Sequence, residues 1–271
     1  MATSPEKLAS GKVVLDHPVD AVARLTICNL DRRNALDHEI LDALATAIRG
    51  LVDGIDVRCL IITGRERSFS AGYDIANITE KSFSKEAEQL VAHPFHDAMA
   101  AIASFPYPTL AVINGHALGG GLELAIQCDL RIAADSAKLG MPPAKLGLVY
   151  SHTGLRKFIE TIGVPRTKEL FLIGRNLSAT EAQEINLVGD VVAYEELEPA
   201  ALKLATEIAS NAPLSLTGNK RVIQELAKLP ILDDQTERKL MNLRIACFDS
   251  GDFREGIKAF SEKRKPKWQG R

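Results

Sequence analysis

Short apolar runs and longer amphipathic runs follow one another along the first half of the chain. The runs 13–15 and 24–28 are rich in β-forming residues and flank the turn-like stretch HPVDAVA, which indicates a hairpin. Asp37 precedes HEILDALATAIRGLV, in which apolar residues recur at helical spacing, so Asp37 is expected to cap a helix. The beginning of the chain therefore predicts two paired strands followed by a helix.

The middle of the chain repeats a strand-then-helix order. The apolar runs 57–63 and 109–113 predict buried strands, and a helix is expected between them at about 86–104. Pro106 and Pro108 interrupt the chain before the second of these strands. Further strands are expected at 130–133 and 138–140. Strands that alternate with helices are typical of an α/β fold with a parallel sheet.

The chain becomes almost wholly helical after Ser151. The Ser178-Ala-Thr-Glu181 spacing is that of a capping box at the start of a helix. Further helices are predicted at 196–210, 213–228, 233–248 and 253–262. We therefore expect an α/β core over residues 1–198 and a helical C-terminal region over residues 199–271.

Composition places the chain among globular enzymes. Its 271 residues are 46% hydrophobic and 25% charged, with a formal net charge of −2, which gives no basis for binding nucleic acid through bulk charge. No apolar stretch reaches the roughly 18 residues of a membrane span, and the N-terminus lacks the features of a targeting signal. We expect a cytoplasmic protein with neither a membrane nor a nucleic acid as partner.

Cysteine and histidine spacing argues against a metal centre. The four cysteines are far apart, and three of them lie in apolar runs, which predicts buried free thiols: Cys28, Cys59 and Cys128, with Cys247 as the fourth. The sequence has no CxxC motif, and Pro94 separates His93 from His96 without another ligand nearby. We expect neither a metal nor a bound cofactor.

Residues 111–129, AVINGHALGGGLELAIQCD, form the most informative stretch. A strand leads into Gly119, Gly120 and Gly121, and a helix with Glu123 near its start follows. Glycines allow a backbone to approach a ligand closely, and the unpaired N–H groups of a first helical turn attract an anionic oxygen. The alternative is a tight packing turn with an ordinary first-turn acid. The phosphate-loop and dinucleotide glycine spacings are both absent.

A second glycine-containing loop follows another buried strand. Here the sequence SFSAGYDI places Gly72 and Tyr73 directly after strand 57–63 and a charged loop. Two such loops could direct two backbone N–H groups at one oxygen, which is the geometry of an oxyanion hole.

The segments SFSAGYDI and NGHALGGGLELAIQCDLRIAADSAKLGMP together resemble the crotonase superfamily, also called the enoyl-CoA hydratase/isomerase family. The resemblance extends over nearly the whole chain, since LTICNLDRRNALD, KLGMPPAKLGLV and DFREGIKAFSEKRKPKW also fit in order. It implies a crotonase-like ββα spiral core with a helical C-terminal extension, and a homotrimer or dimer of trimers. It also implies an acyl-CoA thioester as substrate, with the amides of Tyr73 and Gly120 holding its oxygen as an enolate forms.

The resemblance further implies roles for side chains. Glu123 matches one of the two glutamates of the hydratases, but Pro143 in the triplet Met-Pro-Pro occupies the position of the other. Proline cannot relay a proton, and the family's isomerases keep a carboxylate there, so decarboxylation of a short malonyl-type thioester becomes the preferred reaction. MPPAKLGLVY and the C-terminal segment also resemble the methylmalonyl-CoA decarboxylase branch, which implies that Tyr150 lies beside the substrate carboxylate. Tyr73 departs from that branch, which usually has histidine there.

Binding of CoA is assigned to two regions. Arg32 and Arg33 are second candidates, after the basic tail, for contact with the CoA phosphates, and the loop residues Ala71 and Asp74 are expected to contact the substrate. Phe260 is expected near the adenine, and Lys263 in the basic tail SEKRKPKWQGR near the phosphates. A solvated end is the alternative for this tail. The resemblance implies that the C-terminal region contacts neighbouring subunits and covers the CoA.

The sequence also leaves other functions open. An enoyl-CoA hydratase could work with Glu123 alone, and a non-catalytic relative could bind RNA or a partner through the basic tail. Tyr150 could instead be a half-buried aromatic at a helix entry. His152 is either a spare acid or base, or a helix-start residue.

Overall fold

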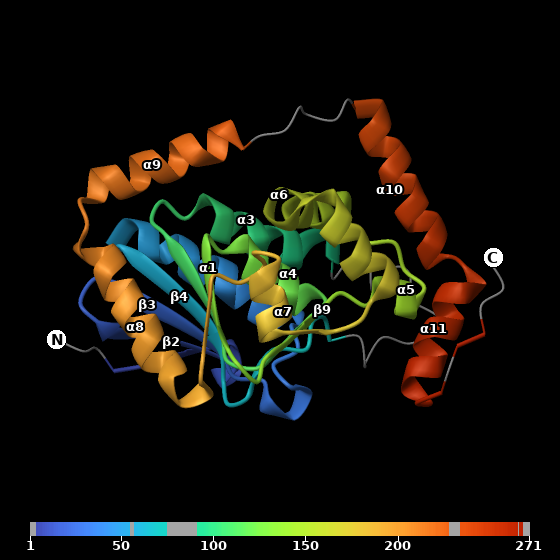
Figure 1. Ribbon diagram of the computed structural model, residues 1–271, viewed down its shortest axis with the longest axis horizontal. Coiled ribbons are helices and arrows are strands. Elements are labelled where there is room, and N and C mark those ends of the chain that lie inside the picture. The colour runs from blue at the N-terminus through green and yellow to red at the C-terminus, as the bar shows by residue number, and fades with distance from the viewer. Residues whose placement is uncertain (1–3, 55–56, 75–90, 228–233, 265, 268–271) are drawn as a thin grey trace.

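The computed structural model describes residues 4–54, 57–74, 91–227, 234–264 and 266–267 (Figure 1). Its largest element is a seven-stranded sheet with the strand order β1-β2-β3-β4-β6-β8-β11. These strands are Glu6–Leu8, Val13–Val19, Val22–Ile27, Cys59–Gly64, Thr109–Ile113, Leu130–Ala134 and Asp190–Val192. Strands β2 and β3 form the expected antiparallel hairpin, and β3, β4, β6, β8 and β11 are parallel, as expected.

A smaller sheet of four short strands lies beside the first and has the order β10-β9-β7-β5. Its members are Leu177–Ser178, Lys138–Gly140, His116–Leu118 and Ser68–Ser70. Strands β5, β7 and β9 follow β4, β6 and β8 along the chain, and helices follow β7 and β9 in turn. This repetition is the ββα spiral of the crotonase fold. Of these four strands the sequence pattern predicted only β9. The other three were missed, because a strand of two or three residues is too short for its hydrophobic periodicity to be recognised dependably.

Two glycines allow the tight turns between the sheets. A β-carbon on Gly64 would lie 2.0 Å from the carbonyl oxygen of Ser68, and one on Gly115 would lie 2.0 Å from that of Arg67. The buried side chain of Asn114 ties these turns together, since its amide donates to the carbonyl of Gly64 at 2.7 Å. The tight turns bring β5 and β7 into register as parallel neighbours.

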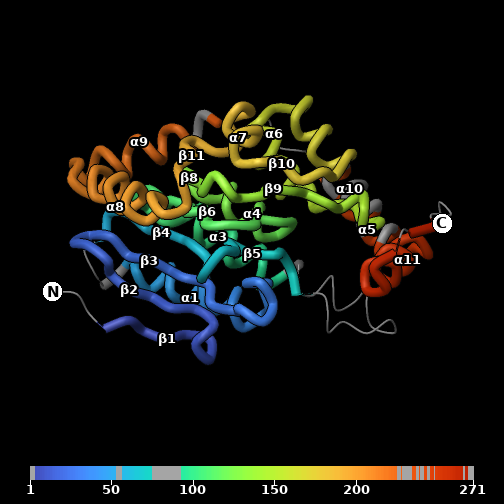
Figure 2. The backbone as a smooth tube through the Cα atoms, turned by 60° about the horizontal axis from the view of Figure 1, so that its bottom comes forward, coloured from blue at the N-terminus to red at the C-terminus, as the bar shows by residue number. Residues whose placement is uncertain are grey.

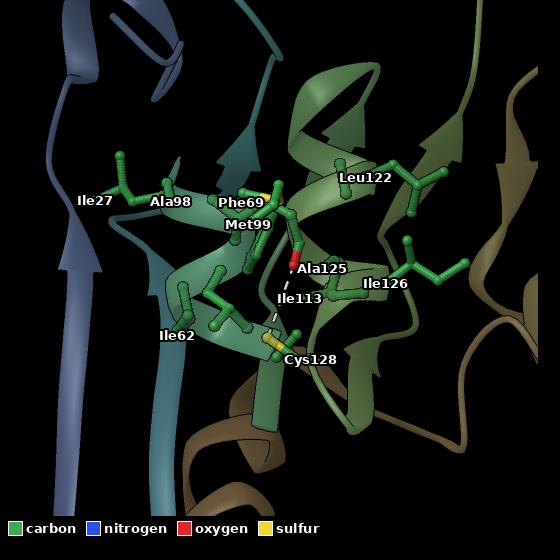
Figure 3. Packing of buried hydrophobic residues seen from close by; sticks show 14 of the residues in the cluster. Ile27, Ile62, Phe69, Ala98, Met99, Ile113, Leu122, Ala125, Ile126 and Cys128 are labelled. Carbon is green, nitrogen blue, oxygen red and sulfur yellow. Dashed lines mark hydrogen bonds between the residues drawn. The ribbon is translucent and has the colours of Figure 1, made fainter. Parts of the chain in front are cut away.

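Helices cover both faces of the large sheet. Helices α1 (His38–Gly54), α3 (His96–Ser104) and α4 (Gly120–Gln127) contribute to the main apolar core on one face, part of which Figure 3 shows. Helix α8 (Tyr194–Ser210) packs on the other face. Leu60 and Ile62 of β4 face the main core, whereas Cys59 and Ile61 face α8. Burial of both faces explains why this strand is continuously apolar.

The remaining helices include the predicted ones and one short helix, at Pro143–Leu146, that the sequence pattern did not predict. They are α5 (Pro143–Leu146), α6 (His152–Lys168), α7 (Ala179–Glu184), α9 (Pro213–Leu226), α10 (Asp234–Phe248) and α11 (Gly251–Ser261). Ser178 and Glu181 form the predicted capping box at the start of α7. In Figure 1, α9 and α10 run along the edge of the molecule, and α11 lies beside α5 at the end opposite α8.

Some predicted boundaries and burial states differ from those observed. A helix was expected at 86–104. Helix α3 and the π-helical turn before it, Val91–Phe95, account for its later part. Residues 86–90 lie outside the described part of the chain. The expected division between residues 198 and 199 falls within α8 and stays a prediction. Cys59 and Cys128 are buried free thiols as expected, but Cys28 is only half-buried. The side chain of Cys247 is outside the described part.

Two properties of the described ranges bear on partners. No helix there is long and apolar enough to cross a membrane. Within the same ranges, no three histidine, cysteine, aspartate or glutamate side chains stand close enough together to hold a metal ion.

Candidate active site

Backbone pairing fixes the direction of the Tyr73 amide. The N–H of Leu36 donates to the carbonyl of Gly72 at 2.7 Å, and the N–H of Asp74 donates to the carbonyl of Leu36 at 2.9 Å. The carbonyl of Gly72 and the N–H of Tyr73 belong to one planar trans peptide group, in which they point in opposite directions. The N–H of Tyr73 therefore points away from Leu36.

The glycine loop turns sharply at the end of β7. Gly119 has φ 52° and ψ −124°, a conformation that side chains other than glycine's rarely permit, and its N–H donates to the carbonyl of Gly140 at 2.9 Å. Gly120 begins α4, so its N–H belongs to the first turn and has no partner within the helix. This N–H carries part of the positive end of the helix dipole.

The two loops lie in direct contact. A β-carbon on Gly72 would lie 2.8 Å from the carbonyl oxygen of Leu118 and 3.3 Å from the nitrogen of Gly120. A β-carbon on Gly121 would lie 2.6 Å from the carbonyl oxygen of Ser70. Only residues without side chains allow this approach. The amides of residues 73 and 120 are thus carried by adjoining loops, an arrangement that can serve one anionic oxygen.

Glu123 lies one helical turn beyond Gly120 and is almost completely buried, with 5% of its surface exposed. Its carboxylate accepts a short hydrogen bond from the hydroxyl of Tyr150. Gly154, in the first turn of α6, lies directly against the same carboxylate, because a β-carbon there would stand 2.6 Å from Oε1. Helices α4 and α6 together therefore hold a buried carboxylate near the glycine loop.

Tyr150 directly precedes α6, whose N-cap is Ser151. Its ring packs edge-on against Phe171, with ring centroids 5.5 Å apart. Burial, followed by the charge of Glu123 and the proximity of Tyr73, raises the pKa of the Tyr150 phenol well above its ordinary value. The hydroxyl therefore stays protonated and keeps donating to Glu123 at physiological pH.

The side chain of Tyr73 completes this cluster. Its ring meets Phe95 edge-on, with centroids 4.8 Å apart, and its phenol lies close enough to Tyr150 to contribute to the raised pKa of that residue. Three of its ring carbons would lie 3.0–3.2 Å from a β-carbon on Gly120. The sequence motifs predicted a role for the backbone of Tyr73 only, and none for Phe95 or Gly154. A glycine within a first helical turn is the signal that could have identified Gly154, because it is unfavourable there unless packing requires it.

The position of the second family glutamate lies close to the glycine loop. Gly140, which accepts the hydrogen bond from Gly119, is followed by Met141, Pro142 and Pro143. Pro143 is buried and is the first residue of α5, where its fixed φ fits and its missing N–H costs nothing. This position thus provides an apolar ring in place of a carboxylate.

The expected CoA-binding residues fall into two groups. Arg32 ends a 3-10 turn, Leu30–Arg32, and the N–H of Ala71 donates to the carbonyl of the adjacent Arg33 at 3.0 Å. Asp74 pairs with Leu36 nearby. An open hollow of about 340 Å³ adjoins Arg33 and is also lined by Arg65 and Arg67. Ala71 and Asp74 therefore lie on the loop that carries Tyr73, and Arg32 lies on a neighbouring turn, beside cationic side chains.

Phe260 and Lys263 form the second group, at the end of α11. Phe260 is 66% exposed, and α11 packs beside α5, as Figure 2 also shows. Within the tail, Arg264 is paired with Glu255 at 2.6 Å. The described contacts join neither Phe260 nor Lys263 to the Tyr73–Glu123 cluster, and their part in binding CoA stays a prediction.

The sequence profile for enoyl-CoA hydratase/isomerase matches residues 19–271. The chain belongs to the enoyl-CoA hydratase/isomerase family. A Bacillus subtilis (strain 168) protein named "Probable enoyl-CoA hydratase" is 38% identical over 252 residues, which cover 92% of this chain and 95% of the relative. The 2,3-dehydroadipyl-CoA hydratase of Escherichia coli (strain K12) is 31% identical over 251 residues, covering 92% and 96%.

Solved structures of this family share the fold. A methylmalonyl-CoA decarboxylase in complex with 2-nitronate-propionyl-CoA has a TM-score of 0.87 and 29% identity, covering 96% of this chain and 99% of that one. An enoyl-CoA hydratase from Bacillus anthracis has a TM-score of 0.76 and 32% identity, covering 96% and 100%. The chain is accordingly a crotonase-fold, acyl-CoA enzyme, as the motifs implied.

Proposed function

We propose that this enzyme decarboxylates a short malonyl-type CoA thioester. The observation that carries the proposal is the hydrogen bond from Tyr150 to the buried Glu123, with Pro143 in place of a second carboxylate. Among the described residues, this site has an anion-stabilising loop and one buried carboxylate that can relay protons. The TM-score to the methylmalonyl-CoA decarboxylase is higher than that to the Bacillus anthracis hydratase, which also supports decarboxylation.

Decarboxylation suits such a site because it needs little proton transfer in its first step. The bond between the α-carbon and the substrate carboxylate breaks, CO2 leaves, and the bonding electron pair moves into the thioester to form an enolate. The amides of Tyr73 and Gly120 stabilise the oxygen of this enolate, and each such donor typically contributes about 3–4 kcal/mol to the transition state. The α-carbon then takes up a proton that comes ultimately from water.

Tyr150 and Glu123 shape the acyl end of the site. The Tyr150 phenol remains protonated, so its hydroxyl is always a hydrogen-bond donor. It can donate to Glu123 or, when substrate is bound, to the substrate carboxylate. Glu123 lies on the same face of α4 as Gly120, so a thioester carbonyl held at Gly120 directs its α-carbon toward these two groups.

Hydration of a 2-enoyl-CoA is the second candidate. The names of the sequence relatives favour it, and the buried carboxylate of Glu123 could in turn activate a water and return its proton. One carboxylate must then perform both steps, which a pair performs more readily.

Parallel assays separate the two reactions. The purified protein is incubated with methylmalonyl-CoA and malonyl-CoA while CO2 release is measured, and with crotonyl-CoA while the enoyl absorbance is followed. We expect CO2 release that Glu123→Gln or Tyr150→Phe lowers strongly. Rapid loss of the crotonyl absorbance without CO2 release from either diacid thioester would reject decarboxylation. If no acyl-CoA were turned over, the non-catalytic alternative would gain support.

Assembly and location belong to the same proposal. We propose a trimer or dimer of trimers in the cytoplasm, on the basis of the family resemblance. Analytical ultracentrifugation tests the assembly, and a monomer at micromolar concentration would contradict it.

A further inference from the structure

The Tyr73 side chain lies on the surface of the glycine loop. Its ring carbons would stand only 3.0–3.2 Å from a β-carbon on Gly120, so the ring is in contact with the glycine itself. Phe95 supports the ring from the side in an edge-on contact at 4.8 Å between centroids. Packing on both Gly120 and Phe95 fixes the ring in place.

The hydroxyl-bearing end of the ring is the part that lies nearest Gly120, because the closest ring atoms are Cζ, Cε1 and Cε2. The Tyr73 phenol lies close enough to that of Tyr150 to raise its pKa, and the hydroxyl of Tyr150 donates to Glu123. The hydroxyl-bearing end of Tyr73 therefore occupies the space between Gly120 and the Tyr150 phenol. If the thioester oxygen binds at Gly120, this is the space that the acyl group must enter.

We propose that the Tyr73 ring sets the acyl-chain limit of this enzyme by closing the acyl space between Gly120 and Tyr150, which restricts productive binding to short acyl groups. The inference rests on the proposed function, since it takes the thioester to bind at Gly120. Within that site Tyr73 has two roles, because its backbone serves the oxyanion and its side chain selects the substrate.

The aromatic surroundings make this a rigid limit. Phe171 packs edge-on against Tyr150 at 5.5 Å and against Phe158 at 5.0 Å between centroids. A longer acyl chain would have to displace one ring of this packed set. Close-packed interiors resist such displacement, and misfit of one methylene group in a binding pocket typically changes binding about 10-fold or more.

Binding of saturated thioesters tests the limit without relying on turnover. Acetyl-CoA, propionyl-CoA and octanoyl-CoA are titrated calorimetrically into the wild type, Tyr73→Ala and Tyr73→Phe. We expect the wild type and Tyr73→Phe to bind octanoyl-CoA at least about 10-fold more weakly than propionyl-CoA. Tyr73→Ala should remove that difference mainly by strengthening octanoyl-CoA binding. Tyr194→Ala, which removes an equal ring on α8, should keep the wild-type preference.

The outcomes distinguish this inference from the proposed function. If Tyr73→Ala folds, as circular dichroism and thermal unfolding show, and keeps the wild-type preference for propionyl-CoA, Tyr73 is not the limit. A wild type that already binds octanoyl-CoA as tightly as propionyl-CoA also overturns the inference, while leaving acyl-CoA binding intact. A wild type that binds none of the three thioesters overturns both the inference and the proposed function.

Discussion

Gly154 lies against the carboxylate of Glu123 so closely that a β-carbon on residue 154 would stand 2.6 Å from Oε1 and 2.8 Å from a ring carbon of Tyr150. The two residues belong to different helices, α6 and α4. The absence of a side chain at position 154 therefore determines where the Glu123 carboxylate can lie.

Gly154→Ala should lower turnover on the order of 10- to 100-fold, because displacement of a catalytic group by about 1 Å can cost that much. Thermal unfolding should show that the variant still folds. The matched variant Gly218→Ala, on exposed α9 where an added β-carbon meets nothing within 4 Å, should keep wild-type turnover. Equal turnover in the two variants would contradict the constraint on Glu123.

Two replacements of Gly120 separate the effect of its N–H on turnover from the effect of its missing side chain. Gly120→Pro removes the N–H at a helix position that tolerates proline, and should lower turnover about 100-fold or more. Gly120→Ala keeps the N–H but forces a β-carbon into the ring of Tyr73. The second change Tyr73→Ala should therefore restore activity to Gly120→Ala but not to Gly120→Pro. Restoration of both, or wild-type rates in Gly120→Pro, would show that this amide is not a donor.

The raised pKa of Tyr150 predicts a pH effect on stability. Below the unfolded pKa of about 10 the phenol is neutral in both states and contributes no pH dependence. As the pH rises further, the unfolded chain loses this proton while the folded chain keeps it, so the free energy of unfolding falls by up to about 1.4 kcal/mol per pH unit. Urea unfolding at about pH 9 and about pH 11 should show a smaller fall in Tyr150→Phe than in the wild type. Equal falls would contradict the shifted pKa.

A partly buried ion pair joins α9 to the large sheet. Lys220 Nζ lies 2.6 Å from Asp129 Oδ2 and donates to the carbonyl of Tyr107 at 2.9 Å. Lys220→Met should lower the free energy of unfolding by about 1–3 kcal/mol, because hydrogen bonds to a charged group are lost while Asp129 keeps its bonds from Thr109. Urea unfolding measures this change.

Lys203→Met, on the exposed side of α8, is the control and should stay within about 0.5 kcal/mol of the wild type. A Lys220→Met variant as stable as this control would show that α9 is held by other contacts, among them the bond from Gln224 to the carbonyl of Ala103.

Local patterns in the sequence were enough to predict most of the large elements. The hairpin at β2 and β3, the buried strands β4 and β6, and the cap at Ser178 each depend on residues adjacent in the chain. The two glycine loops could also be found in this way, because a backbone that must approach another closely requires glycine wherever it lies. Glu123 could be placed relative to Gly120 by helix geometry alone, because residues three apart lie on one face of a helix.

The tertiary structure alone decided how side chains from distant segments meet. The ring of Tyr73 on Gly120, the hydroxyl of Tyr150 on Glu123 and the contact of Gly154 with that carboxylate depend on how β5, β7, α4 and α6 pack. Such contacts leave no periodic signal in any one segment, since each partner satisfies its own local pattern. The sequence therefore determined which backbone could hold an anion, whereas packing determined which side chains surround the acyl group.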